Sequence, residues 1–228
     1  MANQHFTDAS LKFLARLDKN NDRDWFQQHK QEYEDLVRSP ALDFIADMGD
    51  TIESLSSHYL AIPKKVGGSM MRPYRDVRFS RDKRPFKTNV GIQFRHFQAR
   101  DVHAPGFYLH IEPRNCFVAA GMWRPEAEPL AAIRRAIHEQ PQQWLKVSRG
   151  KPFANVFELS GESLRNPPRG YKRDHPLIED LKRKDFIAFA PLDEGRVVTR
   201  NLKTDVARSF RAAVPFMQFL CKALEIPF

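Results

Sequence analysis

The sequence predicts an α+β fold, with N-terminal helices, a central antiparallel β-meander and C-terminal helices around one sheet. In residues 7–57, and in several segments of residues 126–224, apolar residues recur every three or four positions, which is the period of an amphipathic helix. Between these parts, residues 90–122 hold segments in which apolar and polar residues alternate, as in half-buried strands. Helices grouped on both sides of a run of strands are typical of this fold class.

Three helices are expected first. Thr7 and Asp22 can cap two of them, and Ser39-Pro40 can start the third, because serine caps helices and proline suits the first helical position. The apolar residues expected to face inward are Leu11, Leu14 and Leu17, then Trp25, Phe26 and Tyr33, then Phe44, Ile45, Met48 and Ile52. We expect Trp25, Phe26 and Tyr33 to pack the second helix onto the sheet, without touching a ligand.

The predicted strands follow. In the first, Val90, Ile92 and Phe94 alternate with polar residues or glycine, and in the second Phe107, Leu109 and Ile111 alternate with Tyr108, His110 and Glu112. A third strand is expected from Cys116 to Met122, after the turn-like Pro113-Arg114-Asn115. These three strands make a β-meander.

The C-terminal part predicts more helices and one further strand. A helix is expected from Glu126 to about Glu139, a short one after Pro141 and another from Pro176. Residues 186–190 are expected to form the strand. The last helical stretch, residues 203–224, is expected to be interrupted or kinked before Pro215.

The chain of 228 residues is expected to form a single α+β domain with three differently charged parts. Residues 1–63 are helical and acidic, with 6 basic and 11 acidic side chains. Residues 64–124 contain a basic loop and the sheet, and residues 125–228 contain the later helices and the strand. The sequence shows no signal-peptide pattern and no apolar run long enough to span a membrane, which predicts a cytoplasmic protein.

The basic loop is the main electrostatic feature, because residues 64–103 hold 11 basic and 3 acidic side chains. Arginine forks match phosphate and carboxylate geometry, and lysines add point charges. The candidate ligand-binding residues there are Arg75, Arg78, Lys83 and Lys87. The alternative is that Asp76 and Asp82 pair with these arginines and hold the loop in place.

The second predicted strand supplies a second group of candidates. Tyr108, His110 and Glu112 share its polar face. His110 is a candidate general acid or base, with Glu112 or Asp82 orienting it, and Tyr108 is a candidate ligand-binding residue. The alternative is an ordinary hydrogen-bonded group on an exposed face. No zinc or EF-hand spacing is present, so no metal and no cofactor is expected.

Several motifs, in this order, carry a resemblance to a known family. The first is Asn20-Asn21-Asp22-Arg23-Asp24-Trp25-Phe26 and the second is the run Arg75–Thr88. Gly106–Pro113, Gly121–Pro125, Pro168-Arg169-Gly170-Tyr171 and His175-Pro176 follow. Together they resemble the family called domain of unknown function 2461. The resemblance implies a single α+β domain and a cytoplasmic protein, and its name implies no activity. Phe86 stands where the family pattern has tyrosine.

Two hypotheses about function follow. The first is a basic site for an anionic, phosphate-containing ligand, either nucleic acid or a phosphorylated small molecule. The alternative is an enzyme, a hydrolase or transferase acting on a phosphorylated substrate, with His110 as acid or base.

We expect Arg75, Arg78 and Lys83 to lie in one cleft with His110, which would favour the enzyme. Arg78 is expected to bind a phosphate or Asp82, so that its loss costs more binding than the loss of Lys87.

Overall fold

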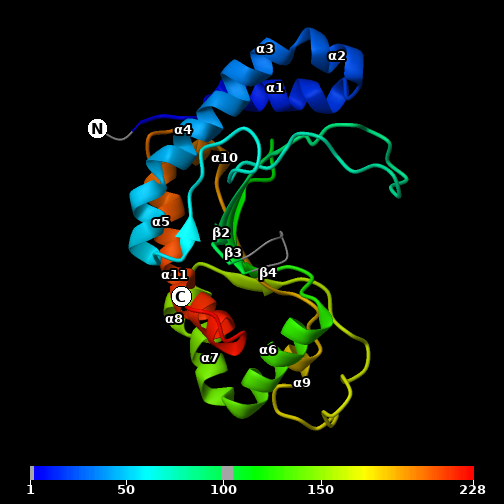
Figure 1. Cartoon of the computed structure of the whole chain (residues 1–228), viewed down its shortest axis with the longest axis vertical. Coiled ribbons are helices and arrows are strands. Elements are labelled where there is room, and N and C mark those ends of the chain that lie inside the picture. The colour runs from blue at the N-terminus through cyan, green and yellow to red at the C-terminus, as the bar shows by residue number, and fades with distance from the viewer. Residues whose placement is uncertain (1–2, 99–104) are drawn as a thin grey trace.

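The structure is a computed structural model that describes residues 3–98 and 105–228. Within these residues, six strands form one antiparallel sheet with the order β1-β2-β3-β4-β6-β5. Figure 1 shows helices above and below the sheet and along its left side. The predicted α+β fold is therefore confirmed.

The predicted meander is present. The strands are β1 (Tyr59–Leu60), β2 (Val90–His96), β3 (Gly106–Ile111), β4 (Phe117–Met122), β5 (Glu158–Ser160) and β6 (Phe186–Pro191). Strands β2, β3 and β4 pair in chain order, and β6 extends the sheet beside β4. The edge strands β1 and β5 were not predicted, because two or three residues are too few to show an alternation.

The N-terminal helices are α1 (Asp8–Lys19), α2 (Arg23–Gln28), α3 (Lys30–Tyr33), the π-helix η1 (Glu34–Arg38), α4 (Ser39–Asp47) and α5 (Gly49–Leu55). Phe26 and Tyr33 are buried as expected. The expectation that they pack on the sheet is wrong. Their rings lie against each other, Tyr33 also contacts Phe13 of α1, and Phe26 stacks on Phe86, with ring centres 4.0 Å apart.

The later helices are α6 (Ala127–Glu139), α7 (Pro141–Arg149), α8 (Lys151–Ala154), α9 (Ile178–Leu181), α10 (Glu194–Val197) and α11 (Leu202–Ala223). Helix α11 continues through Pro215, so an interruption there is wrong. Proline removes one backbone hydrogen bond. The side chains of Phe210 and Phe216, on either side of it, are fully buried, and their packing holds both halves of the helix in place.

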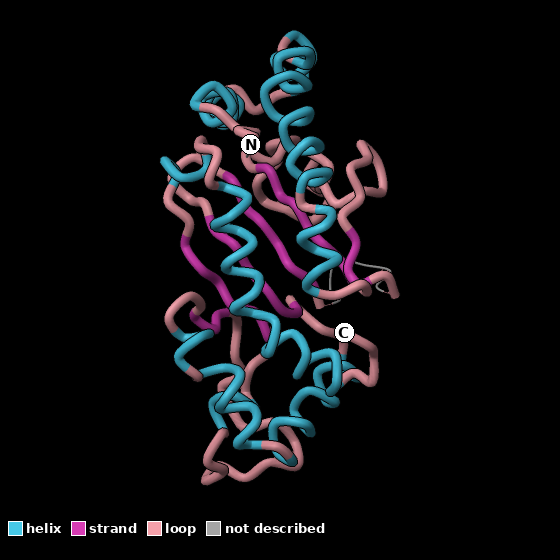
Figure 2. The backbone as a smooth tube through the Cα atoms, turned by 90° about the vertical axis from the view of Figure 1, so that its left-hand side faces the viewer, coloured by secondary structure: helices cyan, strands magenta, loops and turns pink. Residues whose placement is uncertain are grey.

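Helices α4, α5 and α11 cover one face of the sheet, as Figures 1 and 2 show. In this layer the ring of Phe210 lies 4.9 Å from that of Phe107 and 5.9 Å from that of Phe94. The other side chains of β3 therefore project from the opposite face, which we call the open face. No helix in the described part of the chain is long and apolar enough to span a membrane.

The basic run forms an arm, residues 71–89, that extends away from the sheet beside α1 and α2 (Figure 1). Its two limbs pair through Arg75 N–H to the Pro85 carbonyl at 2.9 Å and Lys87 N–H to the Pro73 carbonyl at 2.7 Å. The side-chain amide of Asn21 makes two 3.0 Å hydrogen bonds with the backbone of Phe86. The first two sequence motifs thus meet in space, and the helices fix the arm.

Candidate functional site

Strand β3 presents a line of hydrogen-bonded side chains on the open face. Phe107, Leu109 and Ile111 are buried in the core, so Tyr108 and His110 face the other way, as their alternation predicts. The Tyr108 hydroxyl lies 2.9 Å from His110 Nδ1, and His110 Nε2 lies 3.3 Å from a carboxylate oxygen of Glu112. We call these three residues the Tyr-His-Glu line.

The contacts assign the protons of this line. A carboxylate only accepts hydrogen bonds, so Nε2 carries the imidazole proton and donates it to Glu112. Nδ1 of the neutral ring is then an acceptor, and the Tyr108 hydroxyl donates to it. Burial lowers the pKa of His110 and the charge of Lys87 acts in the same direction, while Glu112 opposes both. His110 is therefore neutral near pH 7.

The two residues at the ends of the line, Tyr108 and Glu112, are held in the protonation states that these hydrogen bonds require. Burial raises the pKa of Tyr108, and the nearby Glu112 charge raises it further, so the phenol keeps its proton. Burial would raise the pKa of Glu112, but hydrogen bonds from Thr88 at 2.6 Å and from Asn115 at 3.0 Å lower it overall. Glu112 is therefore a charged, well-anchored carboxylate next to a neutral imidazole.

Gly91 makes room for this arrangement. It pairs with His110 across the two strands, and a Cβ atom at this position would lie 2.7 Å from the Tyr108 hydroxyl oxygen. The same Cβ atom would lie 3.1 Å from the sulfur of Met71. Any larger residue would force the tyrosine ring away from His110, because real Cβ atoms do not approach other atoms so closely.

The Tyr108 and His110 side chains line a cavity of about 320 Å³ on the open face. Its other lining residues come from β2, β3, β4, the residue after β4, β6 and the start of the arm: Met71, Gln93, Gly106, Phe117, Ala119, Ala120, Gly121, Trp123, Ile187 and Phe189. The ring of Phe117 is parallel to that of His110, with centres 4.5 Å apart. A polar line thus opens onto a largely apolar cavity.

Lys87, at the base of the arm, is half-buried and has no carboxylate partner among the described residues. Its only side-chain hydrogen bond within these residues goes to the Met71 sulfur, 3.9 Å from the ammonium nitrogen. Burial lowers the pKa of Lys87, and the nearby charge of Arg72 lowers it further. Because Met71 also lines the cavity, an uncompensated positive charge lies next to the Tyr-His-Glu line.

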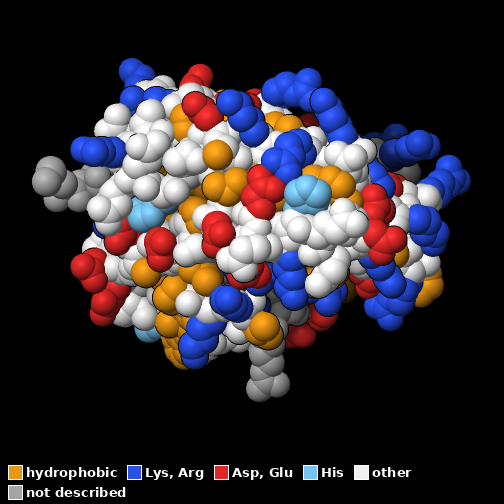
Figure 3. Space-filling view, turned by 90° about the horizontal axis from the view of Figure 1, so that it is seen from above, with side chains coloured by type: hydrophobic (Ala, Val, Ile, Leu, Met, Phe, Trp, Pro, Cys, Tyr) orange, Lys and Arg blue, Asp and Glu red, His pale blue; other side chains and the backbone are white. Residues whose placement is uncertain are grey.

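The arginines of the arm are already paired. Arg75 contacts Asp82 at 2.6 Å, and Arg78 contacts Asp76 at 2.7 Å. Arg84 bridges Asp82 and Asp18 of α1. Hydrogen bonds from Arg84, and then from Arg75, hold the pKa of Asp82 well below its usual range. The right-hand end of Figure 3, where the arm lies, accordingly shows Lys and Arg side chains interspersed with Asp and Glu.

Two expectations about the site are corrected by these positions, and one choice between two residues is decided. Arg75, Arg78 and Lys83 do not line the cavity that His110 lines, and neither does Lys87, so the convergence that was expected to favour the enzyme is absent. Arg78 binds Asp76 instead of Asp82. The carboxylate on His110 is that of Glu112, whereas Asp82 is bound within the arm. Residues close together in the basic run form ion pairs that hold the loop in its shape. Because the arm extends away from the sheet, these side chains lie away from it as well.

Comparison with known proteins gives one match. Residues 9–219 match the model of a family described as conserved hypothetical protein (DUF2461). The chain belongs to this family. The description assigns no activity, and no curated protein and no solved structure matches this DUF2461 member. The resemblance seen in the sequence motifs is thus confirmed.

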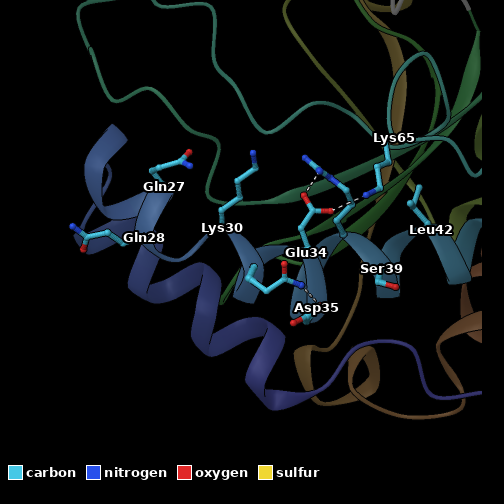
Figure 4. Close-up of a pocket in the computed structure, with 10 residues that line it drawn as sticks. Gln27, Gln28, Lys30, Glu34, Asp35, Ser39, Leu42 and Lys65 are labelled. Carbon is cyan, nitrogen blue, oxygen red and sulfur yellow. Dashed lines mark hydrogen bonds and ion pairs between the residues drawn. The ribbon is translucent and has the colours of Figure 1, made fainter.

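Another hollow in this DUF2461 protein is a groove of about 850 Å³ along α2, α3, η1 and α4. Figure 4 shows its polar lining, with Glu34 held between Lys65 and the side chain of Arg38. The sequence analysis did not anticipate this groove, because the π-helical turn that shapes it has no clear sequence pattern. Glu34 is thus paired with two of the basic side chains that line the groove.

The geometry at Gly91 gives a prediction. Gly91→Ala should push the Tyr108 ring aside and break its hydrogen bond to Nδ1. Since that bond stabilises the neutral imidazole, the pKa of His110 should rise towards its ordinary value. An NMR titration of the imidazole signals, with His110→Gln to identify the right one, measures this pKa. Gly49→Ala is the control, because its Cβ meets nothing within 4 Å. An unchanged His110 pKa in Gly91→Ala would contradict the account.

Proposed function

We propose that the protein is an enzyme that hydrolyses or transfers the phosphoryl group of a small phosphorylated substrate. The observation that carries this proposal is the Tyr-His-Glu line at the wall of a cavity. A hydroxyl bonded to a neutral imidazole, which a carboxylate orients in turn, is the arrangement that enzymes use to move protons. An ordinary surface histidine does not need a half-buried carboxylate held by Thr88 and Asn115.

The proton moves along the line in a balanced way. The attacking group is water in hydrolysis or an acceptor hydroxyl in transfer, and it gives its proton to the Tyr108 oxygen. Tyr108 passes its own proton to His110 Nδ1, and Glu112 stabilises the imidazolium that forms. As the bond from phosphorus to the leaving oxygen breaks on the opposite side of phosphorus, that oxygen takes a proton from solvent water, and the proton held by His110 returns through Tyr108 to solvent. Each residue of the line ends in its starting state.

Lys87 supplies the positive charge that a phosphate needs. It is half-buried, where a charge is worth more than in water, and it has no competing carboxylate partner in residues 3–98 and 105–228. Arg75 and Arg78, in contrast, are paired within the arm. We therefore assign substrate binding to Lys87 and place Arg75, Arg78 and Lys83 in the support of the arm.

The proposal predicts the behaviour of matched variants on a panel of phosphate monoesters. Tyr108→Phe and His110→Gln should each lower kcat/KM by about 100-fold or more, the usual scale of a lost acid or base. Arg78→Ala should leave kcat/KM unchanged, because its side chain is exposed and pairs only with Asp76. The measurement is phosphate release, or transfer to an added alcohol. Equal activity in all four proteins, or none in the wild type, would contradict the proposal.

The pH dependence provides an internal check on the same assay. His110 must be neutral to accept a proton, so kcat/KM should rise with pH through a pKa below 6.5. Lys87 must be charged to bind phosphate, so kcat/KM should fall again through a pKa below 10.5. Lys87→Met should remove the alkaline limb and keep the acidic one.

A second candidate function is binding of single-stranded nucleic acid by the end of the arm. The observation that favours it is Phe79, which is 95% exposed, with the Arg78 guanidinium 5.9 Å from its ring centre. Exposed aromatic side chains among basic residues can stack on bases.

This candidate predicts an affinity for an oligonucleotide that falls steeply with salt, because bound phosphates release counterions. Phe79→Ala should weaken binding by about 1–3 kcal/mol, and Lys83→Ala should lower the salt slope by about 1. Fluorescence anisotropy at several salt concentrations measures both. Absence of binding, or an affinity independent of salt, would exclude it.

A further inference from the structure

The walls of the open-face cavity are mainly aromatic. The rings of His110 and Phe117 stack face to face in one wall, and the Phe189 ring meets Phe117 edge-on, with centres 4.9 Å apart. Trp123 stands at the rim with 47% of its surface exposed. Aromatic walls of this kind complement an aromatic ligand, because ring faces and edges attract each other in stacked and edge-to-face contacts.

The floor of the cavity is the sheet itself, covered only by small residues. Gly106, Ala119 and Gly121 lie side by side on β3 and β4 and line the cavity. At Gly121 a Cβ atom would lie 2.1 Å from the Phe186 carbonyl oxygen, so this position excludes any side chain. A ligand can therefore approach the backbone of the sheet closely.

The polar groups lie at one end of this cavity. Along β3, the lining residues run from His110 to Gly106, which is about 13 Å at about 3.3 Å per residue. Tyr108 and His110, with Lys87 beyond Met71, mark the polar end. Gly106, Gly121 and Ile187, paired across three strands, mark the apolar end. A matching ligand has a charged group at one end and an apolar body at the other.

The size of the cavity restricts the ligand further. A volume of about 320 Å³ is at the lower end of the range for small-molecule sites. It suits one ring system with a single substituent group better than a polymer or a long alkyl chain. The positive charge of Lys87 at the polar end makes that group negative.

We propose that the substrate is a small aromatic phosphate ester, whose ring lies between Phe117, Phe189 and Trp123 and whose phosphate meets Lys87 and Tyr108. The phosphate part of this inference rests on the proposed function, whereas the ring site rests on the cavity alone. In this arrangement the ester bond that breaks in the reaction lies where the polar and apolar ends of the cavity meet, beside the Tyr108 hydroxyl.

Calorimetric titration with three probes tests the ring site. The probes are naphthyl phosphate, naphthol and glycerol phosphate, which separate the ring from the charge. Naphthyl phosphate should bind about tenfold or more tightly than either partial probe, a difference of about 1.4 kcal/mol or more. Ala119→Leu, which fills the cavity, and Trp123→Ala, which removes an exposed wall, should each weaken both aromatic probes about tenfold. Phe97→Ala, a half-exposed aromatic outside the cavity, is the control.

The outcomes separate this inference from the proposed function. If Tyr108→Phe binds naphthyl phosphate as the wild type does, while no protein releases phosphate, the ring site stands and the proposed reaction is wrong. If naphthyl phosphate binds no better than glycerol phosphate, or if Ala119→Leu and Trp123→Ala both bind it normally, the ring site is wrong.

Discussion

Packing of α11 against one face of the sheet is the interaction on which the rest of the structure depends. Phe210 lies between Phe94 of β2 and Phe107 of β3, and all three side chains are fully buried. Each such side chain contributes about 1.5–3 kcal/mol by leaving water. Because strand side chains alternate, fixing Phe107 in this layer sends Tyr108 and His110 to the open face. A register shift by one residue would bury the polar line and expose the core.

The arm depends on a different kind of interaction, local charge pairing fixed by the N-terminal helices. Asp82 accepts from both Arg75 and Arg84, and Arg84 continues to Asp18 of α1. Exposed ion pairs contribute little each, so the buried stack of Phe86 on Phe26 supplies the stronger anchor. The arm thereby holds its last residues, Lys87 and Thr88 among them, against β3. In this account the arm is a scaffold for the site, and its arginines serve that purpose.

The sequence predicted those parts of the structure in which apolar residues repeat at a short, regular interval along the chain. Alternation identified β2 and β3 and put Tyr108, His110 and Glu112 on one face, where the structure has them hydrogen-bonded in a row. The cavity could not be predicted, because Phe117 and Trp123 lie at opposite ends of β4 and Phe189 belongs to β6, which pairs with β4 only in the fold.

The run of basic residues shows where sequence reasoning reaches its limit. Composition alone does not show which basic side chains form ion pairs, because pairing depends on distances of a few ångströms between side chains in the folded arm. Arg75 and Arg78 looked suited to a phosphate, yet each has an aspartate within 3 Å. Lys87 was one basic residue among many in the sequence, and its burial beside Met71 sets it apart. Gly91, which gives Tyr108 its place, had no signal beyond a glycine within a strand.

The central claim is that anions bind beside Lys87 and the Tyr-His-Glu line instead of on the arm. A crystal structure of the protein soaked with tungstate, a phosphate analogue with a strong anomalous signal, tests it most directly. The account predicts a tungstate within hydrogen-bond distance, about 3 Å, of the Lys87 ammonium and the Tyr108 hydroxyl. Tungstate bound only to Arg81, Lys83 or other residues of the outer arm, with none beside Lys87, would contradict it.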